Sequence, residues 1–279
     1  MVVFIQFARD CLGEALLTCP HHTPKAMAGK RKKPPESYRH RSYRQQVGDS
    51  QLIACQVQVR ETDLQILSSV EVRQAALHLV VQYRNQLENY LPRQPRFLEA
   101  LTPLPDDLTA PPLVRAMLQA GLITEVGPMA AVAGVIAEFV GRDLLKLPGC
   151  DEVVVENGGD IFLSRKQACN IAIFAGPSSL SNRVGLRLTP GQMPCGVCTS
   201  SASVGHSLSL GRADAVTVVA ASAALADAAA TCIGNLVKSK GDLGRALEVA
   251  AAIPGLTGAL IIIGEELGAW GELELVEVY

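Results

Sequence analysis

Aromatic side chains are scarce in this sequence: Phe, Trp and Tyr make up 4% of its 279 residues, with a single Trp. Because 48% of the chain is nonetheless hydrophobic, a core must be packed mainly from Ala, Val, Leu and Ile. No apolar run reaches the roughly 20 residues of a membrane-spanning helix. The N-terminus lacks a basic segment before an apolar stretch, which argues against a secretory signal. These absences predict a cytoplasmic protein with no membrane partner and reduced thiols among its eight cysteines.

Charge is distributed unevenly along the chain. Residues 1–48 contain nine Lys and Arg against three acidic residues, a net charge of +6, so the remainder carries −8. A nucleic-acid-binding protein is expected to show a basic folded face instead of a basic tail. We therefore predict that residues 1–48 are a disordered basic extension, that residues 49–279 form one folded domain, and that nucleic acid is not a partner.

Apolar periodicity after residue 50 changes between period two and helical spacing, which predicts grouped strands and helices. The expected strands are 51–59, 64–68, 152–156, 161–164, 171–175, 184–188, 197–201, 215–220, 259–263 and 272–278. The expected helices are 70–91, 113–120, 127–145, 223–238 and 243–252. Grouping of this kind indicates an α+β fold with antiparallel or mixed sheets and Ala/Gly-rich helices packed against them.

The sharpest chemical signal is the segment Ala-Asp227-Ala-Ala-Ala-Thr231 in an Ala-rich helix. Asp227 and Thr231 are four residues apart, so their oxygens share one helix face. Carboxylate and hydroxyl oxygens are hard ligands of the kind that Mg²⁺ accepts together with phosphates and water. The alternative is structural: an acid in the first turn stabilises the helix dipole, and Thr231 bonds back to a carbonyl.

A second signal is the segment Glu156-Asn157-Gly158-Gly159-Asp160 at the end of a predicted strand. The two glycines permit positive φ and close approach of the backbone to another group. Asn157 and Asp160 could then hydrogen-bond a heterocycle edge or a ribose. A tight hairpin turn explains the same glycines, and both interpretations can hold together.

A third signal is the hydroxyl-rich loop over 198–207. Thr199, Ser200 and Ser201 could cradle phosphate oxygens through side-chain and backbone donors. His206 could act as a general base near neutral pH. The alternative for this histidine is a structural hydrogen bond to a neighbouring carbonyl.

Two further features remain open between structural and functional roles. The helix predicted over 127–145 consists largely of small side chains, which allow close approach either to a ligand or to a sheet. Cys195 and Cys198 form a single CxxC pair. Without a second pair or a surrounding βαβ pattern, it gives little support to a zinc site or a thioredoxin-like site.

Taken in chain order, these motifs resemble the ApbE-type FAD:protein FMN transferases. Asn-Gly-Gly-Asp160, the Thr-Ser200 loop, His206 and Ala-Asp-Ala-Ala-Ala-Thr231 follow one another as in that family, and the helix around Gly134 is similar to its glycine-bearing helix. An uncharacterised short family related to ApbE is more similar still. It shares Gly-Pro-Met-Ala-Ala-Val-Ala-Gly, Glu-Asn-Gly-Gly-Asp-Ile and Thr-Ser-Ser-x-x-Val-Gly-His-Ser, and this resemblance covers residues 38–278.

The resemblance implies a site for FAD or FMN and Mg²⁺. Asp227 and Thr231 would be metal ligands together with a backbone carbonyl at Ala131, and His206 and Asp227 would be catalytic. The implied reaction transfers FMN from FAD to a Ser or Thr hydroxyl of an acceptor protein and releases AMP. The residues that would contact the flavin nucleotide are Gly134, Asn157, Gly158, Gly159, Asp160, Thr199, Ser200 and Ser201.

The sequence departs from the transferase pattern at two places. Ala133 stands where the transferases carry Lys, and the segment from Ser207 to Asp214 replaces their Ile-Asp-Pro-x-Thr-Gly, with Asp214 the residue that could compensate. Loss of a positioned acid or base costs about two to four orders of magnitude in rate. Three alternatives therefore stand: an enzyme that transfers FMN or cleaves the FAD pyrophosphate, a flavin-binding protein without turnover, and a structural member that has lost the ligand. Exposed small-residue helices and terminal strands could support a homodimer.

Overall fold

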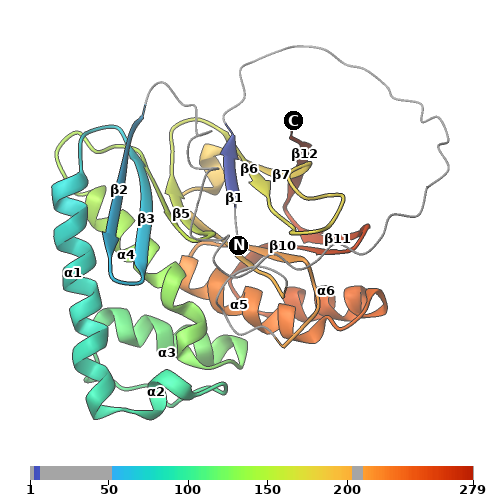
Figure 1. The fold of residues 1–279 in the computed structure, drawn as a ribbon, viewed down its shortest axis with the longest axis horizontal. Helices are drawn as coiled ribbons and strands as arrows, with labels where there is room; N and C mark the ends of the chain where they lie inside the picture. Colours follow the sequence, from blue (N-terminus) through green and yellow to red (C-terminus); the bar gives the residue numbers. More distant parts are fainter. Residues whose placement is uncertain (1–2, 7–51, 203–209, 279) are drawn as a thin grey trace.

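The computed structural model of the protein describes residues 3–6, 52–202 and 210–278. These residues form a layer of helices, an eight-stranded sheet and a four-stranded sheet (Figure 1). Strand pairing in both sheets is antiparallel. The α+β class expected from the sequence is therefore confirmed.

The eight-stranded sheet forms the middle layer. Its inner strands β4, β5 and β8 are buried on both faces, because helices cover one face and the second sheet covers the other. In spatial order the strands are β11 (Glu266–Gly271), β10 (Leu256–Ile263), β9 (Ala215–Ala220), β8 (Cys195–Ser200), β5 (Asp160–Ser164), β4 (Val153–Asn157), β3 (Thr62–Ser68) and β2 (Ile53–Val59).

The four-stranded sheet packs on the outer face of this middle layer. Its strands, in order, are β1 (Val3–Gln6), β6 (Cys169–Ile173), β7 (Val184–Leu188) and β12 (Glu274–Glu277). Strand β1 lies within the extension predicted for residues 1–48, and it pairs with β6. The rest of that predicted extension, residues 1–2 and 7–48, lies outside the described residues.

Alternation along the central strands divides the core in two. Val154, Ile161 and Val197 face the four-stranded sheet, whereas Val155 and Phe162 face the helices. A side-chain period of two produces this division. Alternate residues of β4, β5 and β8 therefore point their side chains toward the helices, and only these side chains can reach a site there.

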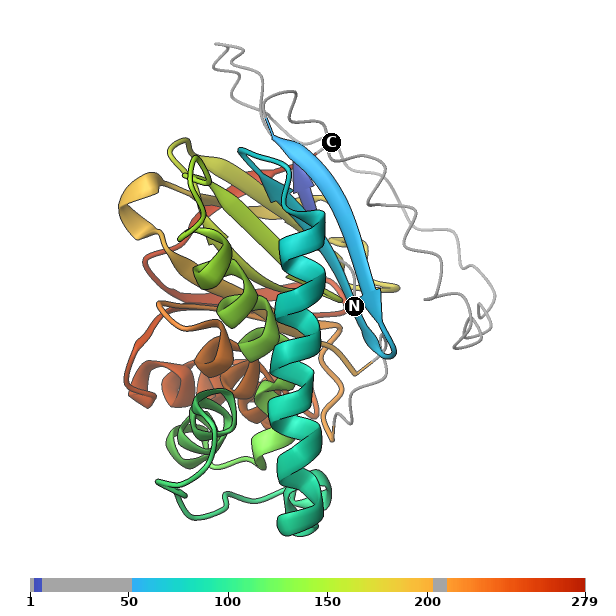
Figure 2. The ribbon, with the colours of Figure 1, turned by 90° about the vertical axis from the view of Figure 1, so that its left-hand side faces the viewer.

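The helix layer follows the order of the strands beneath it. Helix α1 lies along β2, α4 and α5 cover the central strands, and α6 covers β10 and β11; Figure 2 shows α1 running beside the β2–β3 hairpin. The helices are α1 (Arg73–Tyr90), α2 (Arg96–Glu99), α3 (Pro112–Thr124), α4 (Val132–Leu144), α5 (Ala223–Leu236) and α6 (Leu243–Ala252). Short 3-10 helices are η3 (Leu91–Arg93), η4 (Pro128–Ala131), η5 (Pro190–Gln192) and η6 (Lys240–Asp242).

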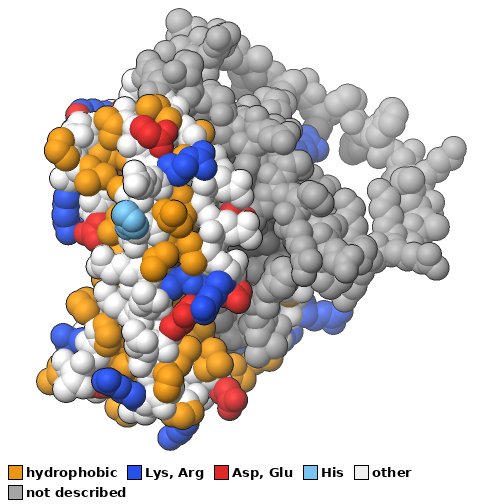
Figure 3. Space-filling view, turned by 60° about the vertical axis from the view of Figure 1, so that its left-hand side comes forward, with side chains coloured by type: hydrophobic (Ala, Val, Ile, Leu, Met, Phe, Trp, Pro, Cys, Tyr) orange, Lys and Arg blue, Asp and Glu red, His pale blue; other side chains and the backbone are white. Residues whose placement is uncertain are grey.

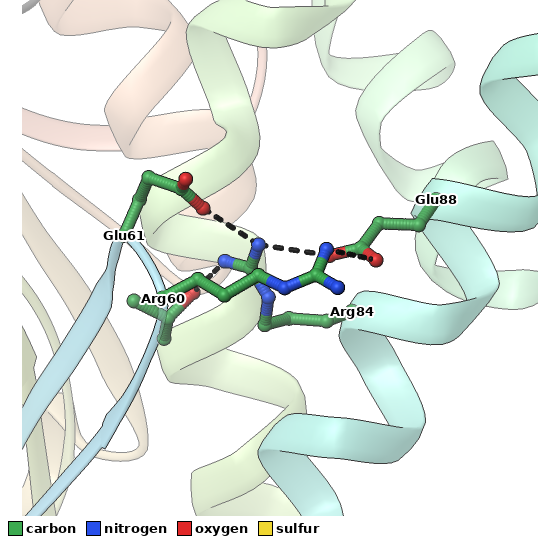
Figure 4. Close-up of polar contacts among 5 residues, drawn as sticks. Arg60, Glu61, Arg84 and Glu88 are labelled. Atoms are coloured by element: carbon green, nitrogen blue, oxygen red, sulfur yellow. Dashed lines mark hydrogen bonds and ion pairs between the residues drawn. The ribbon is translucent and has the colours of Figure 1, made fainter.

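An ion-pair network fixes the β2–β3 turn to α1 (Figure 4). Arg84 lies 2.7 Å from Glu61 and 2.8 Å from Glu88, and Glu88 also accepts from Arg60 at 2.7 Å. Arg84 additionally donates to the hydroxyl of Thr62 at 2.8 Å. The side chain of Arg84 is only 14% exposed, so this pair is less screened than an ordinary surface ion pair.

Most expected elements are present, with a few differences in extent. The helix predicted over 127–145 is divided into η4 and α4, because Pro128 and the following residues form a 3-10 turn before the α-helix begins. Besides β1, the prediction missed α2 and β11, and the strand expected at 272–278 begins at Glu274. Helix α2 and strand β11 are short, with four and six residues, and carry little periodic signal.

No single helix among the described residues is long and apolar enough to cross a membrane. Helix α3 and the η4–α4 segment meet the length and composition criteria only when taken together, with a bend of 108° between them. Both contribute buried residues to the core beside the eight-stranded sheet.

The surface over α1 carries apolar side chains in separate patches between charged ones (Figure 3). Scattered patches of this kind are normal for a protein surface and do not by themselves mark an interface. The homodimer expected from the sequence therefore stays a prediction. Within the part of the chain that the structure describes, the large apolar side chains with the greatest exposure are Leu98, Leu101, Leu108 and Leu210.

Candidate functional site

The Gly-Gly bend is the turn of a tight hairpin between β4 and β5. Asn157 and Asp160 are paired across it, and Gly158 and Gly159 between them have φ of 70° and 122°. Positive φ at both turn positions favours glycine strongly. The structural interpretation of this motif is therefore confirmed, and what remains is the direction in which its polar side chains point.

Asn157 and Asp160 belong to the strand face that is covered by helices. They continue the rows of Val155 and Phe162, which lie in the helix-side core. The Asn157 side-chain amide donates to the carbonyl of Ala133 at 3.1 Å, just inside the start of α4. The hairpin turn is thereby joined to the small-residue helix.

Asp227 meets the same end of α4 from the other side. Its Oδ2 accepts the backbone N–H of Gly134 at 2.8 Å, and the N–H of Ala133 also bonds to this carboxylate. These are first-turn amides of α4, which have no partner within their own helix. Asp227 thus stabilises the N-terminus of α4, and not the first turn of its own helix as the structural alternative supposed.

Gly134 makes this contact possible because it has no side chain. A Cβ at this position would lie 2.2 Å from the carbonyl oxygen of Ala223 and 2.8 Å from Cβ of Asp227. Both distances are far below van der Waals contact. The small residues of α4 therefore serve a close helix–helix approach that holds Asp227 beside Ala133 and Asn157.

The two carboxyl groups of the site, Asp160 and Asp227, influence each other's ionisation. Burial raises the pKa of Asp160 to about 7, and the nearby Glu156 charge acts in the same direction. Burial also raises the pKa of Asp227 well above its ordinary value, and the charge of Asp160 raises it further. Like charges that share a buried site favour either a shared proton or a bound cation.

Cys198 lies in this electrostatic environment as well. It is paired with Asp160 across β5 and β8, and its thiol contacts the carbonyl of Ala223 at 3.3 Å. Burial raises the pKa of this thiol well above its usual value, and the charges of Asp160 and Asp227 add to the effect. Cys195 instead lies in the core between the two sheets, so the CxxC pair points to opposite faces and cannot act as one thiol pair.

The oxygen donors near α4 and α5 suit a hard cation. Thr231 lies one turn after Asp227 on α5 and is partly exposed, while Ala131 is buried at the end of η4. Within the described residues, no group of three or more His, Cys, Asp and Glu side chains could hold a metal by themselves. A cation here would need hydroxyl, backbone and substrate oxygens in addition to carboxylates, as Mg²⁺ typically does.

Strand β8 places its hydroxyl residues on different faces. The Thr199 hydroxyl lies 2.8 Å from that of Thr217, in the row of Val197 that faces the four-stranded sheet. Only its backbone N–H bonds to Asp160. Ser200 points to the helix side, where Gly234 lies against it, and Ser201 is buried at the strand end. The Thr199 side chain is therefore not gathered with Asp160 and Asp227.

The sequence also suggested His206 and Asp214 for chemistry. His206 falls within 203–209, outside the described residues. Asp214 accepts the backbone N–H of Gly264 at 2.7 Å, in the turn between β10 and β11. Its carboxylate, just before the start of β9, is thus used to hold this turn.

Sequence reasoning missed Glu138, a buried acid on α4. Its Oε2 accepts the N–H of Ala223 at 2.7 Å, and its Oε1 accepts from Arg142 at 2.8 Å. One signal was available, because Glu138 is the single charged residue between Val126 and Gly141. A lone acid on an apolar, small-residue helix face indicates a buried partner.

Comparison with known sequences identifies relatives over most of the chain. The sequence model of the family described as AbpE bacteria matches residues 44–268. A UPF0280 protein of Methanococcus maripaludis strain C5 is 38% identical over 223 residues, which covers 78% of this chain and 90% of the relative. A UPF0280 protein of Methanocaldococcus jannaschii is 41% identical over 208 residues, which covers 72% and 84%.

Comparison with solved structures finds the same fold at low identity. The flavin transferase ApbE from Vibrio cholerae superposes with a TM-score of 0.54 at 13% identity, covering 78% of this chain and 96% of that one. The Pseudomonas stutzeri flavinyl transferase ApbE gives 0.51 at 14% identity, covering 78% and 93%. Since sequence relatives establish membership and these structures establish the architecture, the chain belongs to the family described as AbpE bacteria and has the fold of the ApbE flavin transferases.

Proposed function

We propose that this chain binds a flavin nucleotide, FAD or FMN, together with Mg²⁺ beside the β4–β5 turn. The observation that carries the proposal is the meeting of Asp160 and Asp227, two carboxyl groups with raised pKa values, at the glycine turn and the start of α4. Membership in a family with the ApbE fold supports the ligand class.

The donor set of the site fits Mg²⁺. Asp227 and Thr231 would hold the ion, with a backbone carbonyl near Ala131 and oxygens of the ligand completing its shell. Bound there, Mg²⁺ would neutralise the FAD pyrophosphate and stabilise AMP as the leaving group. The raised pKa of Asp227 agrees with this arrangement, because a divalent cation stabilises the ionised form that burial disfavours.

The remaining residues have proposed positioning roles. Asn157, Gly158 and Gly159 would line the flavin, and backbone and hydroxyl groups of Ser200 and Ser201 would contact the nucleotide. Gly134 keeps α4 close enough for this, because any side chain there would displace α5. The Thr199 hydroxyl has its own partner on the opposite face, so we assign only its backbone to the site.

The reaction that this arrangement would support is FMN transfer from FAD to a Ser or Thr hydroxyl of an acceptor protein. His206 would accept the hydroxyl proton as a general base. We propose the cytoplasm as the location of this activity. One observation favours flavin binding without turnover as a second candidate: the methyl group of Ala133 cannot replace the lysine that the transferases carry, although its backbone N–H and carbonyl are both used.

The test is incubation of the purified chain with FAD and MgCl₂, with FAD affinity, AMP release and protein mass measured on the same sample. We expect FAD to bind at least about tenfold more tightly with Mg²⁺ than with EDTA, because two carboxylates alone repel the pyrophosphate. The Asp227→Asn variant should lose this Mg²⁺ dependence. Release of AMP together with a +FMN adduct on the protein would identify a transferase. FAD binding without release of AMP would identify the second candidate, flavin binding without turnover.

A matched control keeps the result specific to the site. Asp214→Asn makes the same substitution at an aspartate that holds the β10–β11 turn, and this variant should retain the Mg²⁺ dependence of FAD binding. Unchanged Mg²⁺-dependent FAD affinity in Asp227→Asn, or absence of FAD and FMN binding in the unaltered chain, would overturn the proposed function.

A further inference from the structure

The carboxylate of Glu138 binds the N-terminus of the helix that carries Asp227. Its Oε2 accepts the hydroxyl of Ser222 at 2.9 Å and the N–H groups of Ala223 and Ala224 at 2.7 and 3.2 Å. Ser222 is the N-cap of α5, so these are the amides that a helix leaves without internal partners. Glu138 is 6% exposed, which strengthens each of these bonds.

The arrangement is reciprocal between α4 and α5. Glu138 of α4 accepts the first-turn amides of α5, and Asp227 of α5 accepts the first-turn amides of Ala133 and Gly134 in α4. Each carboxylate also lies at the positive end of the other helix's dipole, which stabilises its negative charge. Displacement of one helix along the other would therefore break both sets of bonds at once.

Close backbone contacts leave little room for α5 to adjust. A Cβ on Gly196 of β8 would lie 2.3 Å from Cα of Ala223, and one on Gly134 would lie 2.2 Å from the carbonyl oxygen of the same residue. The first turn of α5 is thus held between β8, α4 and the Glu138 carboxylate. Asp227 follows one turn later, so its position depends on this anchor.

We propose that Glu138 is a positioning residue that sets where the Asp227 carboxylate lies relative to the start of α4. The placing of Asp227 by Glu138 follows from the contacts above, whereas its effect on Mg²⁺ and FAD binding rests on the proposed function. A carboxylate is needed because donors approach both oxygens: three on Oε2 and Arg142 on Oε1. A Gln side chain offers one acceptor oxygen, and its NH₂ group would face a donor. An Asp side chain is one methylene shorter than Glu, so its carboxylate would lie farther from the amides of α5.

The direct test is hydrogen exchange of the Gly134 amide, which bonds to Asp227, in the unaltered protein and in Glu138→Gln. We expect exchange at Gly134 to become about tenfold faster in the variant, under conditions where both proteins are folded. The matched control is Glu152→Gln. Glu152 likewise accepts a backbone N–H, from Lys166 at 2.9 Å, and an arginine, Arg165 at 3.3 Å, but neither of these partners belongs to α4 or α5.

A second variant covers the case in which Glu138→Gln fails to fold. Arg142→Gln removes the donor on Oε1, together with a longer bond of 3.3 Å to the carbonyl of Ala221 and a contact with the Phe162 ring, from a side chain that is 44% exposed. It should speed Gly134 exchange in the same direction by a smaller factor. The positioning role is overturned if the Gly134 amide exchanges no faster in Glu138→Gln and Arg142→Gln than in Glu152→Gln. If Glu138→Gln does not fold, the same result in Arg142→Gln overturns it.

The ligand readout separates this inference from the proposed function. If FAD binding depends on Mg²⁺, Glu138→Gln should raise the Mg²⁺ concentration needed for half-maximal FAD binding about tenfold, with Glu152→Gln unchanged. An unchanged Mg²⁺ requirement despite faster exchange would reject the link from geometry to binding. Failure of the unaltered protein to bind FAD would reject the proposed function, and the exchange result would still decide the role of Glu138.

Discussion

At the residue scale, the proposed site contains two acids that are costly to ionise. Asp160 and Asp227 are placed together by a hairpin turn and a helix that are 67 positions apart in the sequence. Burial without a cation favours their protonated forms. The ionisation of this pair should therefore leave a signature in the stability of the ligand-free protein.

That signature is a loss of stability as the pH rises. The folded protein holds the Asp160 proton up to about pH 7, whereas the unfolded chain releases it near its ordinary pKa of 3.8. Between these values the folded state binds more protons, so its stability falls with rising pH and levels off above about 7. Asp160→Asn cannot ionise. In EDTA, we expect the melting temperature of this variant, relative to that of the unaltered protein, to increase as the pH rises from about 5 to 7.5.

Every other titratable group is common to both proteins, and loss of the Asp160 charge also lowers the pKa of Asp227, which adds to the gain of the variant. A difference in melting temperature that stays constant or shrinks over this range would show that Asp160 has an ordinary pKa in the folded state. Excess Mg²⁺ should reduce the pH-dependent difference, since a cation stabilises the ionised pair.

The residue scale also shows the limit of sequence reasoning. Asp227, Thr231 and the Asn157–Asp160 turn could be identified because spacing and order along the chain carry their signal. The two partners of Asp227, the N–H groups of α4, could not, because a helix terminus has no distinctive side chain. Glu138 was missed for the same reason: its partners are backbone amides 85 and 86 positions away.

At the element scale, periodicity predicted the central strands and the long helices well. Strands β4, β5, β8 and β9 are short, apolar and bounded by turn residues, which is the pattern that strand prediction detects. Prediction did not include β1, which lies in a segment interpreted as a disordered extension from its charge run and its Pro34-Pro35 pair. It also did not include β11, whose residues alternate weakly in burial. Sheet order likewise depends on long-range pairing that no local pattern contains.

Helix α4 offers a sharp test of packing against helix propensity. Gly134→Ala should destabilise the protein by about 1–3 kcal/mol in thermal or denaturant unfolding, because the added methyl overlaps Ala223 and Asp227. Propensity alone predicts a gain of up to about 1 kcal/mol. Gly244→Ala in α6 is the control: nothing lies within 4 Å of its Cβ position, so propensity should dominate and stability should rise. Equal stabilisation by both would refute the close approach of α4 and α5.

The β2–β3 hairpin offers a second test at this scale. Arg84→Gln removes the cation that joins Glu61 of the turn to Glu88 of α1. We expect a loss of about 1 kcal/mol in unfolding free energy, near the upper end for surface pairs because Arg84 is largely buried. Arg183→Gln, whose pair with Glu277 spans 3.7 Å between exposed side chains, should have little effect. Equal losses would show that burial of Arg84 does not strengthen its pairs.

At the scale of the whole molecule, the proposed ligand site draws on several elements of the folded chain. The turn after β4, the start of α4 and the body of α5 all belong to the helix-side core. A ligand that bridges these elements binds only the folded state. Binding must therefore raise global stability and not merely local order.

We accordingly predict that FAD with Mg²⁺ raises the melting temperature. At a free FAD concentration of about 100 times Kd, linkage gives about 2.7 kcal/mol, which for a chain of this size corresponds to roughly 5–10 °C in differential scanning fluorimetry or calorimetry. FAD with EDTA should give a smaller shift, and Asp227→Asn should give the same small shift with or without Mg²⁺. If neither FAD, FMN nor AMP changes the melting temperature of the unaltered protein, the fold has been kept without its flavin site, and the structural alternative is the correct one. A shift with AMP alone would instead assign the site to an adenine nucleotide, because the isoalloxazine ring would then contribute nothing to affinity.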